Sequence, residues 1–428
     1  MGARPAPAVE PRRLRAAGRG RVPWPVLAGL TLLTVCGLIA AWRDLIPGVS
    51  YWDNAVGALV ASVRFTGPVA AGLAALVAAR HPRERVWSGM GLVAGVATVA
   101  YAILTLAVCA KTLWYGASGH LVVSGVLAGL AALLLHVSVG YVAGSLVRSP
   151  VTAAVGAAAC YLAAGWVLAR DGAWWRLLAP TASPPETVFA HWRPSVFDGR
   201  LAWYAGLAAL IAAGYAVAVL RRRALVVPLV LAVAVAATGA VQLHRYRGHA
   251  LTVSAATDLA CRDWPLTICV HPALRGALPK LEVAAIPVAE RLTGTPGEFR
   301  RLVQLRAGAD ARNAGRGVAW LTLRTLSDGY GDTAMMSVVR RLPDARACAR
   351  PGADRGYTDL VLTWLGTGRI DRHASAGAEF ARMGESQRRA WLHAHYDRFR
   401  TCRLRAEDFT WREAVPRSAY APHTGPPG

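Results

Sequence analysis

Hydrophobic residues in the first 245 positions gather in long runs that carry almost no charge. A bilayer core about 30 Å thick needs roughly 20 apolar residues of α-helix to cross it. The runs predict seven membrane-spanning helices, at Trp24–Trp42, Ala55–Ala79, Gly91–Ala110, Leu121–Val147, Val151–Leu168, Leu201–Leu220 and Ala224–Leu243. We therefore expect a mainly α-helical, polytopic membrane bundle over residues 23–244.

The first window follows an arginine-rich tail and so also resembles a secretory signal. Cleavage would need small residues at the end of the run, which instead reads Ala40-Ala41-Trp42-Arg43-Asp44. A retained helix is favoured, preceded by a disordered basic tail over residues 1–22.

Loop charges predict the orientation, because positive residues are retained on the cytoplasmic side. With the N-terminus inside, the inner segments carry 13 arginines and the outer loops six basic residues. Four of those six lie in the loop Ala169–Arg200, whose tryptophans Trp174, Trp175 and Trp192 suggest a position along the interface. The chain is thus expected to be a multi-pass plasma-membrane protein with a cytoplasmic N-terminus and an extracytoplasmic C-terminal domain.

The density of acidic residues rises after Arg245, because 18 of the 25 acidic residues follow it. Residues 245–415 predict a mixed α/β or helix-rich domain, and residues 416–428 a disordered tail. The expected elements are strands at Leu266–Val270 and Val318–Leu326, and helices at Ala273–Leu292, Thr333–Arg341, Thr358–Leu365 and Ser386–Arg400. Pro279 and Pro287 should kink or split the first of these helices.

Cysteine positions agree with an outer domain. Three cysteines lie inside predicted spans, where free thiols act as small apolar residues, and four lie in the C-terminal domain. We favour disulfides between Cys261 and Cys269 and between Cys348 and Cys402, with four reduced thiols on an inner domain as the alternative.

Composition supports burial in lipid, because 54% of residues are hydrophobic, 17% are charged and the mean hydropathy is +0.33. The net charge of +23 would suggest a nucleic-acid partner if it were clustered on a soluble domain. Much of it flanks the hydrophobic spans, so we expect the lipid bilayer, and no nucleic acid, as a partner.

Sequence motifs argue against enzymatic activity. The chain has no G-x-x-x-x-G-K-[ST] phosphate loop, no H-E-x-x-H metal motif and no G-x-S-x-G nucleophile motif. His393 and His395 would diverge by about 200° on a helix and cannot chelate one metal together. His271 could be a ligand or a base, although a structural histidine is favoured. We expect that the chain is not an enzyme and that it has no cofactor and no metal site.

Two ionisable residues fall inside the predicted spans. Arg64 is expected near the outer interface, with its side chain extended toward the headgroups. His136 is a functional candidate by default, but none of the seven windows contains a carboxylate that could partner it in a proton relay. We expect it to hydrogen-bond between helices, near Ser138 and Tyr141. Close helix packing is expected at four glycines of the same window, namely Gly125, Gly129, Gly140 and Gly144.

One stretch, Gly67-Pro68-Val69-Ala70-Ala71-Gly72 followed by the basic loop Arg80-His81-Pro82-Arg83-Glu84-Arg85, resembles permease-like membrane proteins of high-GC Gram-positive bacteria. Further similarity lies in Ile268-Cys269-Val270-His271-Pro272-Ala273, Leu292-Thr293-Gly294-Thr295-Pro296 and Arg389-Ala390-Trp391-Leu392. Proteins of this kind are described as membrane subunits of ATP-binding-cassette exporters. The chain departs from well-studied exporters in its predicted seven spans, where six are usual, and in its appended domain.

The resemblance implies a transport subunit served by a separate ATPase, since the chain has no phosphate loop of its own. Docking of that ATPase is expected at two groups of inner arginines, Arg80, Arg83 and Arg85 in one loop and Arg221, Arg222 and Arg223 in another. A homodimer is compatible with this hypothesis. The alternative is a membrane-anchored extracytoplasmic binding or sensor protein without transport activity.

Overall fold

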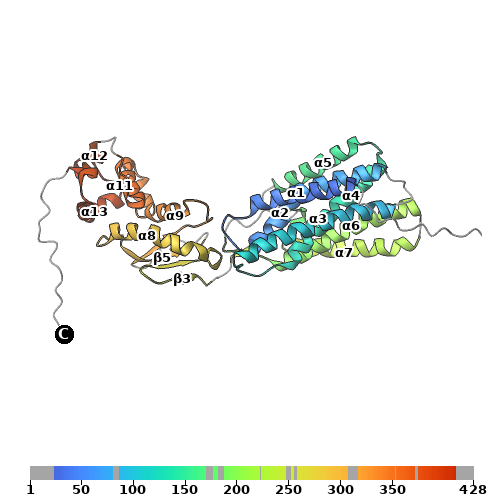
Figure 1. Ribbon diagram of the computed structural model, residues 1–428, viewed down its shortest axis with the longest axis horizontal. Helices are drawn as coiled ribbons and strands as arrows, with labels where there is room; N and C mark the ends of the chain where they lie inside the picture. Colours follow the sequence, from blue (N-terminus) through green and yellow to red (C-terminus); the bar gives the residue numbers. More distant parts are fainter. Residues whose placement is uncertain are drawn as a thin grey trace, which may run out of the picture.

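The computed structural model describes residues 24–80, 86–169, 177–181, 188–221, 223–246, 252–254, 258–306, 317–351, 353–371 and 375–410. The expected disordered tails lie outside these residues. The described part of the chain forms an elongated molecule with a helical bundle at one end and a smaller mixed domain at the other (Figure 1).

The bundle contains seven helices that run alternately toward and away from the C-terminal domain (Figure 1). They are α1 (Trp24–Asp44), α2 (Trp52–Arg80), α3 (Val86–Trp114), α4 (Val123–Leu146), α5 (Val151–Leu168), α6 (Pro194–Leu220) and α7 (Val226–Arg245). Among the described residues, six of these helices are long and apolar enough to cross a membrane, and α5 is a shorter apolar helix. The chain is therefore a multi-pass membrane protein.

The centre of the bundle is formed by α2 and α4, each of which contacts four other helices. A methyl group at Gly140 would overlap the backbone of Ala71, and one at Gly144 the backbone of Ala75. Gly125 and Gly129 likewise lie against side chains of neighbouring helices. The close packing expected at these glycines is confirmed, because without a Cβ two backbones can approach to van der Waals contact.

Three helices begin earlier than the hydrophobic windows predict, namely α2, α3 and α6. The α6 helix starts at Pro194, whereas the window starts at Leu201. The first two turns of α6 contain Asp198 and Arg200, so a search for uncharged windows excludes them. The helix can nevertheless begin at Pro194, because proline is well suited to the first turn of a helix. Similarly, α2 starts at Trp52 and so takes Asp53 into its first turn.

The C-terminal domain contains a four-stranded sheet in the order β3-β4-β5-β6. Its strands are β3 (Ala260–Arg262), β4 (Thr267–Val270), β5 (Phe299–Gln304) and β6 (Gly317–Leu321). The β3–β4 pair is antiparallel, whereas β4–β5 and β5–β6 are parallel. A separate pair, β1 (Ala190–Trp192) with β2 (Thr252–Ser254), joins the segment before α6 to the chain after α7.

Helices make up most of the rest of this domain. They are α8 (Leu278–Leu292), α9 (Tyr330–Val339), α10 (Ala345–Cys348), α11 (Arg355–Thr367), α12 (Ser375–Arg382) and α13 (Glu385–Arg400), with short 3₁₀ turns at Pro272–Ala277 and Ala406–Phe409. The predicted helix Ala273–Leu292 is split just before Pro279, as expected, and Pro287 lies inside α8. The region thus contains a small sheet together with helices.

The core of the C-terminal domain includes residues from segments that connect the membrane helices. Its buried cluster includes Val49 and Tyr51 from the α1–α2 loop, and Val188 and Phe189 from the segment before β1. In the same loop Gly48 packs directly against Leu326, whose backbone N–H donates to Pro47 at 2.9 Å. The domain is therefore not a module beginning at residue 245, because its interior is completed by segments that connect membrane helices.

Candidate functional site

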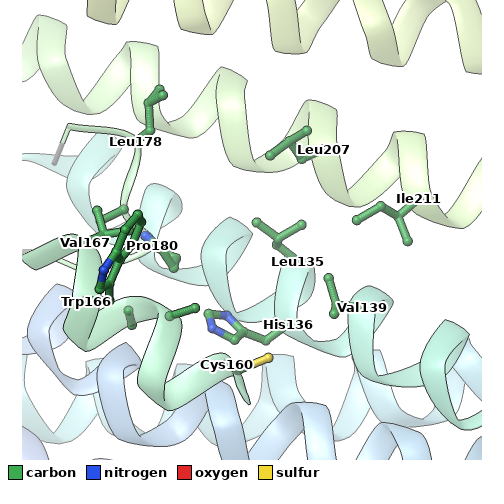
Figure 2. A pocket seen from close by; sticks show the side chains of 13 residues that line it. Leu135, His136, Val139, Cys160, Trp166, Val167, Leu178, Pro180, Leu207 and Ile211 are labelled. Carbon is green, nitrogen blue, oxygen red and sulfur yellow. The ribbon is translucent and has the colours of Figure 1, made fainter. Parts of the chain in front are cut away.

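A cavity of about 410 Å³ lies between α4, α5 and α6. Figure 2 shows side chains from these helices converging on one space, with Trp166 and Pro180 on the side opposite Leu207 and Ile211. The full lining is Leu135, His136, Val139, Cys160, Ala163, Ala164, Trp166, Val167, Leu178, Ala179, Pro180, Leu207 and Ile211. This volume lies within the range of about 300–1,000 Å³ that is typical of small-molecule sites.

His136 belongs to this lining and lies near the middle of α4. Its Nδ1 lies 2.7 Å from the carbonyl of Ala132 in the same helix, and its ring packs against Gly67 of α2. The expected interhelical hydrogen bond is replaced by this bond within α4. Because Nδ1 faces a carbonyl, it carries the proton and Nε2 is left as an acceptor.

Arg200 fixes the segment 177–181 that covers one side of the cavity. Its side chain is 1% exposed and donates to the carbonyls of Leu177 at 2.8 Å, Ala179 at 3.1 Å and Thr181 at 2.9 Å. Tyr204 also donates to Ala179. The expectation that Arg200 is an outer-loop charge is wrong, because it lies in α6 and its charge is satisfied by backbone oxygens.

A second polar site joins the bundle to the C-terminal domain around Asp53. This carboxylate is 3% exposed and lies 3.1 Å from Nδ1 of His191, while its other oxygen accepts the Trp192 backbone N–H at 2.9 Å. The indole N–H of Trp192 donates to the Asp53 carbonyl at 2.6 Å. The Tyr51 hydroxyl lies 2.8 Å from His191 Nδ1. Trp192 is thus buried in this joint, contrary to the expected interfacial position.

His271 lies against the same joint and is 1% exposed. Its ring meets Tyr51 and Phe189 edge to face, with centroids 5.4 Å and 5.2 Å away. Its Nδ1 accepts the Ala273 N–H at 3.1 Å, whereas its buried Nε2 has no hydrogen-bond partner among the described residues. Burial, reinforced by nearby His191, lowers the pKa of His271 to about 4. These contacts favour the structural interpretation of His271.

Arg64 lies well inside α2. It is twelve residues beyond Trp52, so its Cα is about 18 Å along the axis from the start of α2. The guanidinium carbon lies 5.9 Å from the ring centroid of Phe65 and 5.7 Å from that of Tyr161 on α5. Cation–π contact with two aromatic rings accommodates the charge beside an apolar helix.

Two of the arginines expected to dock an ATPase, Arg80 and Arg221, lie at the end of the bundle away from the C-terminal domain. Arg80 ends α2 and is exposed, and Arg221 is exposed just after α6. Arg83, Arg85 and Arg222 lie outside the described residues, and of Arg223 only the backbone is described, in a 3₁₀ turn.

Both favoured cysteine pairs are disulfides. The Cys261–Cys269 bond links β3 to β4, where the two residues are direct cross-strand partners. The Cys348–Cys402 bond joins α10 to the segment after α13. The cysteines of the predicted spans, Cys36, Cys109 and Cys160, are free.

Metal ligands do not gather in the described part of the chain, where no group of three or more His, Cys, Asp or Glu residues could hold an ion. His393 is exposed, while His395 stacks on Trp391 with centroids 4.9 Å apart. The arrangement of the bundle instead offers an apolar compartment with one imidazole acceptor, joined at one end to a second domain.

Sequence reasoning missed Asp53, His191 and Arg200. Asp53 and Arg200 lie just outside the hydrophobic windows, at helix starts that a charge-free criterion rejects. A search for polar residues that lie within two helical turns of a predicted span and close to aromatic residues such as Trp192 could have identified these three residues. Comparison of the chain with protein-family models, with curated proteins and with solved structures finds no match, so the function is argued from the residues themselves.

Proposed function

We propose that the chain is the membrane-spanning subunit of an ATP-binding-cassette type transporter that handles an apolar or amphipathic molecule. The observation that carries this proposal is the cavity between α4, α5 and α6, which lies about halfway along the bundle and has a predominantly apolar lining. A cavity at this depth suits a ligand that partitions into the hydrocarbon core, with His136 Nε2 available to accept one hydrogen bond.

In this proposal all seven helices cross the membrane. Their alternating direction supports opposite sides for the N-terminus and the C-terminal domain. At 18 residues, α5 is about 27 Å long, close to the thickness of the hydrocarbon core. Two disulfides support an extracytoplasmic domain, since such bonds persist in oxidising compartments. The N-terminus is then cytoplasmic.

Energy for transport would come from a separate ATPase, because the sequence has no phosphate loop. Exposed Arg80 and Arg221 lie at the end of the bundle that this orientation places in the cytoplasm. An ATPase docked there would act on the helices that line the cavity through α6, which carries both Leu207 and Ile211 and ends at Leu220.

The alternative function, a membrane-anchored binding or sensor protein, is favoured by the joint around Asp53. The core of the C-terminal domain includes Val49 and Tyr51, so a ligand that moves this domain also moves the start of α2. The two functions differ in their consequence: a transporter changes the distribution of a substrate, whereas a sensor changes only a downstream signal.

The proposal is tested by purifying the tagged full-length protein from its native membranes and measuring ATP hydrolysis with lipophilic compounds added. We expect an ATP-binding-cassette ATPase in the preparation, stimulated by some of these compounds. Ile211→Trp, which fills the cavity, should abolish the stimulation, whereas Ala209→Trp, on an exposed position two residues away, should not. Purification without an ATPase, together with unchanged substrate accumulation in cells lacking the protein, would refute transport and leave the sensor function.

A further inference from the structure

The C-terminal domain has a groove of its own, far from the membrane cavity in the fold. Its volume is about 480 Å³, and it lies between the end of α9, α10 and α11, with the Cys348–Cys402 disulfide in its wall. This volume is again in the range of small-molecule sites, about 300–1,000 Å³. Nothing in the transport proposal uses this groove.

Two guanidinium groups line the groove, from Arg340 at the end of α9 and Arg355 at the start of α11. Arg355 is held in place because its Nε donates to the carbonyl of Cys348 at 3.1 Å, which leaves its two Nη groups for other acceptors. Within the described ranges, neither arginine forms an ion pair. Asp359 is the one carboxylate in the lining.

Two neighbouring carboxylates cap helices instead of forming ion pairs with these arginines. Asp344 accepts the backbone N–H groups of Arg346 at 2.8 Å and Ala347 at 3.1 Å. These two hydrogen bonds, of which the one from Ala347 has the larger effect, hold the pKa of Asp344 below its usual value. Asp354 accepts the N–H of Gly356 at 2.9 Å in the same way at the start of α11. Both carboxylates therefore accept backbone N–H groups, and within the lining itself two guanidinium groups face one carboxylate, that of Asp359.

Apolar side chains complete the lining, with Met336 and Leu362 as its largest members. A guanidinium presents paired N–H donors that match the oxygens of a phosphate or carboxylate. A site that combines two such groups with an apolar wall suits an organic molecule with an anionic head. The disulfide in the wall links α10 to Cys402 and so fixes one side of the groove.

We propose that the groove formed by α9, α10 and α11 binds a small organic anion, with Arg340 and Arg355 contacting its phosphate or carboxylate group and Met336 and Leu362 contacting its apolar part. The proposal goes beyond the transport function and does not depend on it. Such a ligand reaches the groove either as a soluble molecule or as the headgroup of an anionic lipid.

The test measures ³¹P line broadening of phenyl phosphate and of inorganic phosphate with the full-length protein in a maltoside detergent, which contains no phosphorus. Phenyl phosphate should bind more tightly than inorganic phosphate because it also contacts the apolar wall. The double variant Arg340→Gln/Arg355→Gln should weaken phenyl phosphate binding about tenfold or more. Arg300→Gln removes an arginine whose side chain is 88% exposed on β5, outside the groove lining, and should bind as the wild type does.

Equal binding by all three proteins would overturn the proposal, because it would show general attraction to a basic surface. If the double variant does not fold, Arg340→Gln alone serves, since no described bond depends on that side chain. Competition separates the two sources of ligand. Displacement of phenyl phosphate by benzoate indicates a soluble anion, whereas displacement by short-chain phosphatidylglycerol but not by benzoate indicates a lipid headgroup; no displacement by either contradicts a shared anion site.

Discussion

Acidification should weaken the joint between the bundle and the C-terminal domain through His271. An exposed histidine titrates near pH 6.5, whereas buried His271 has a pKa of about 4. Above pH 6.5 the ring is neutral in both the folded and the unfolded chain, so it carries no penalty. Between these two values the unfolded chain takes up a proton that the folded chain does not, and the free energy of unfolding falls as the pH falls.

The magnitude follows from the difference between the two pKa values, which corresponds to about 3 kcal/mol. The loss should be complete near pH 4, where the folded protein also becomes protonated. Groups facing the ring include His191 and Arg306, which disfavour its charge, and Asp53, which favours it. The net effect retains the sign set by burial.

The assay compares denaturant unfolding of the full-length protein in detergent at about pH 7.5 and about pH 4.5. His271→Asn is the matched control, because an asparagine oxygen can accept the Ala273 N–H in place of Nδ1 and does not titrate. The wild type should lose about 2.5 kcal/mol more than the variant over this interval, because the folded protein is not yet fully protonated at about pH 4.5. Equal losses in the two proteins would refute the assignment of a buried, neutral His271.

Three further predictions concern packing, the covered cavity and covalent stability. Gly140→Val should cost about 1–3 kcal/mol or prevent folding, because it separates α4 from α2, whereas Gly156→Val has open space and should change the thermal midpoint little. Arg200→Met should cost about 3 kcal/mol or more by removing charged donors from three carbonyls, measured as a lower thermal midpoint. Replacing both cysteines of Cys348–Cys402 with serine should cost about 4 kcal/mol, because the bond closes a loop with a sequence separation of 54, and an unchanged denaturation midpoint would contradict this.

The membrane bundle could be predicted from the sequence because burial in lipid requires long apolar runs with internally satisfied backbones. All seven windows coincide with helices of the structure. The first residues of these helices could not be predicted as well, because a search for uncharged windows excludes charged residues whatever their partners. In the structure Arg200 donates hydrogen bonds to three carbonyls. Asp53 is bonded to His191 and Trp192. Tertiary partners decide whether a charged residue is tolerated at a helix start.

The candidate sites were harder to predict for the same reason. His136 was identified from its position in a span, but its partner in α4 and the cavity beside it depend on how α5 and α6 pack. The groove between α9 and α11 has no sequence motif, because its two arginines come together only through the fold. Disulfide pairing was easier to predict from the sequence, because the eight-residue separation between Cys261 and Cys269 favours a local bond and leaves Cys348 and Cys402 as the remaining pair.

In the proposed orientation, seven crossings place the C-terminal domain outside the cell and the opposite end of the bundle in the cytoplasm. The most direct measurement labels intact cells with a membrane-impermeant maleimide, in a protein whose Cys36, Cys109 and Cys160 are replaced by alanine. We predict labelling of the C-terminal domain only after mild reduction, without lysis. An added cysteine at exposed Arg148, between α4 and α5, should label only after lysis. Labelling of the domain only in lysed cells would contradict the orientation and with it the proposed transport function.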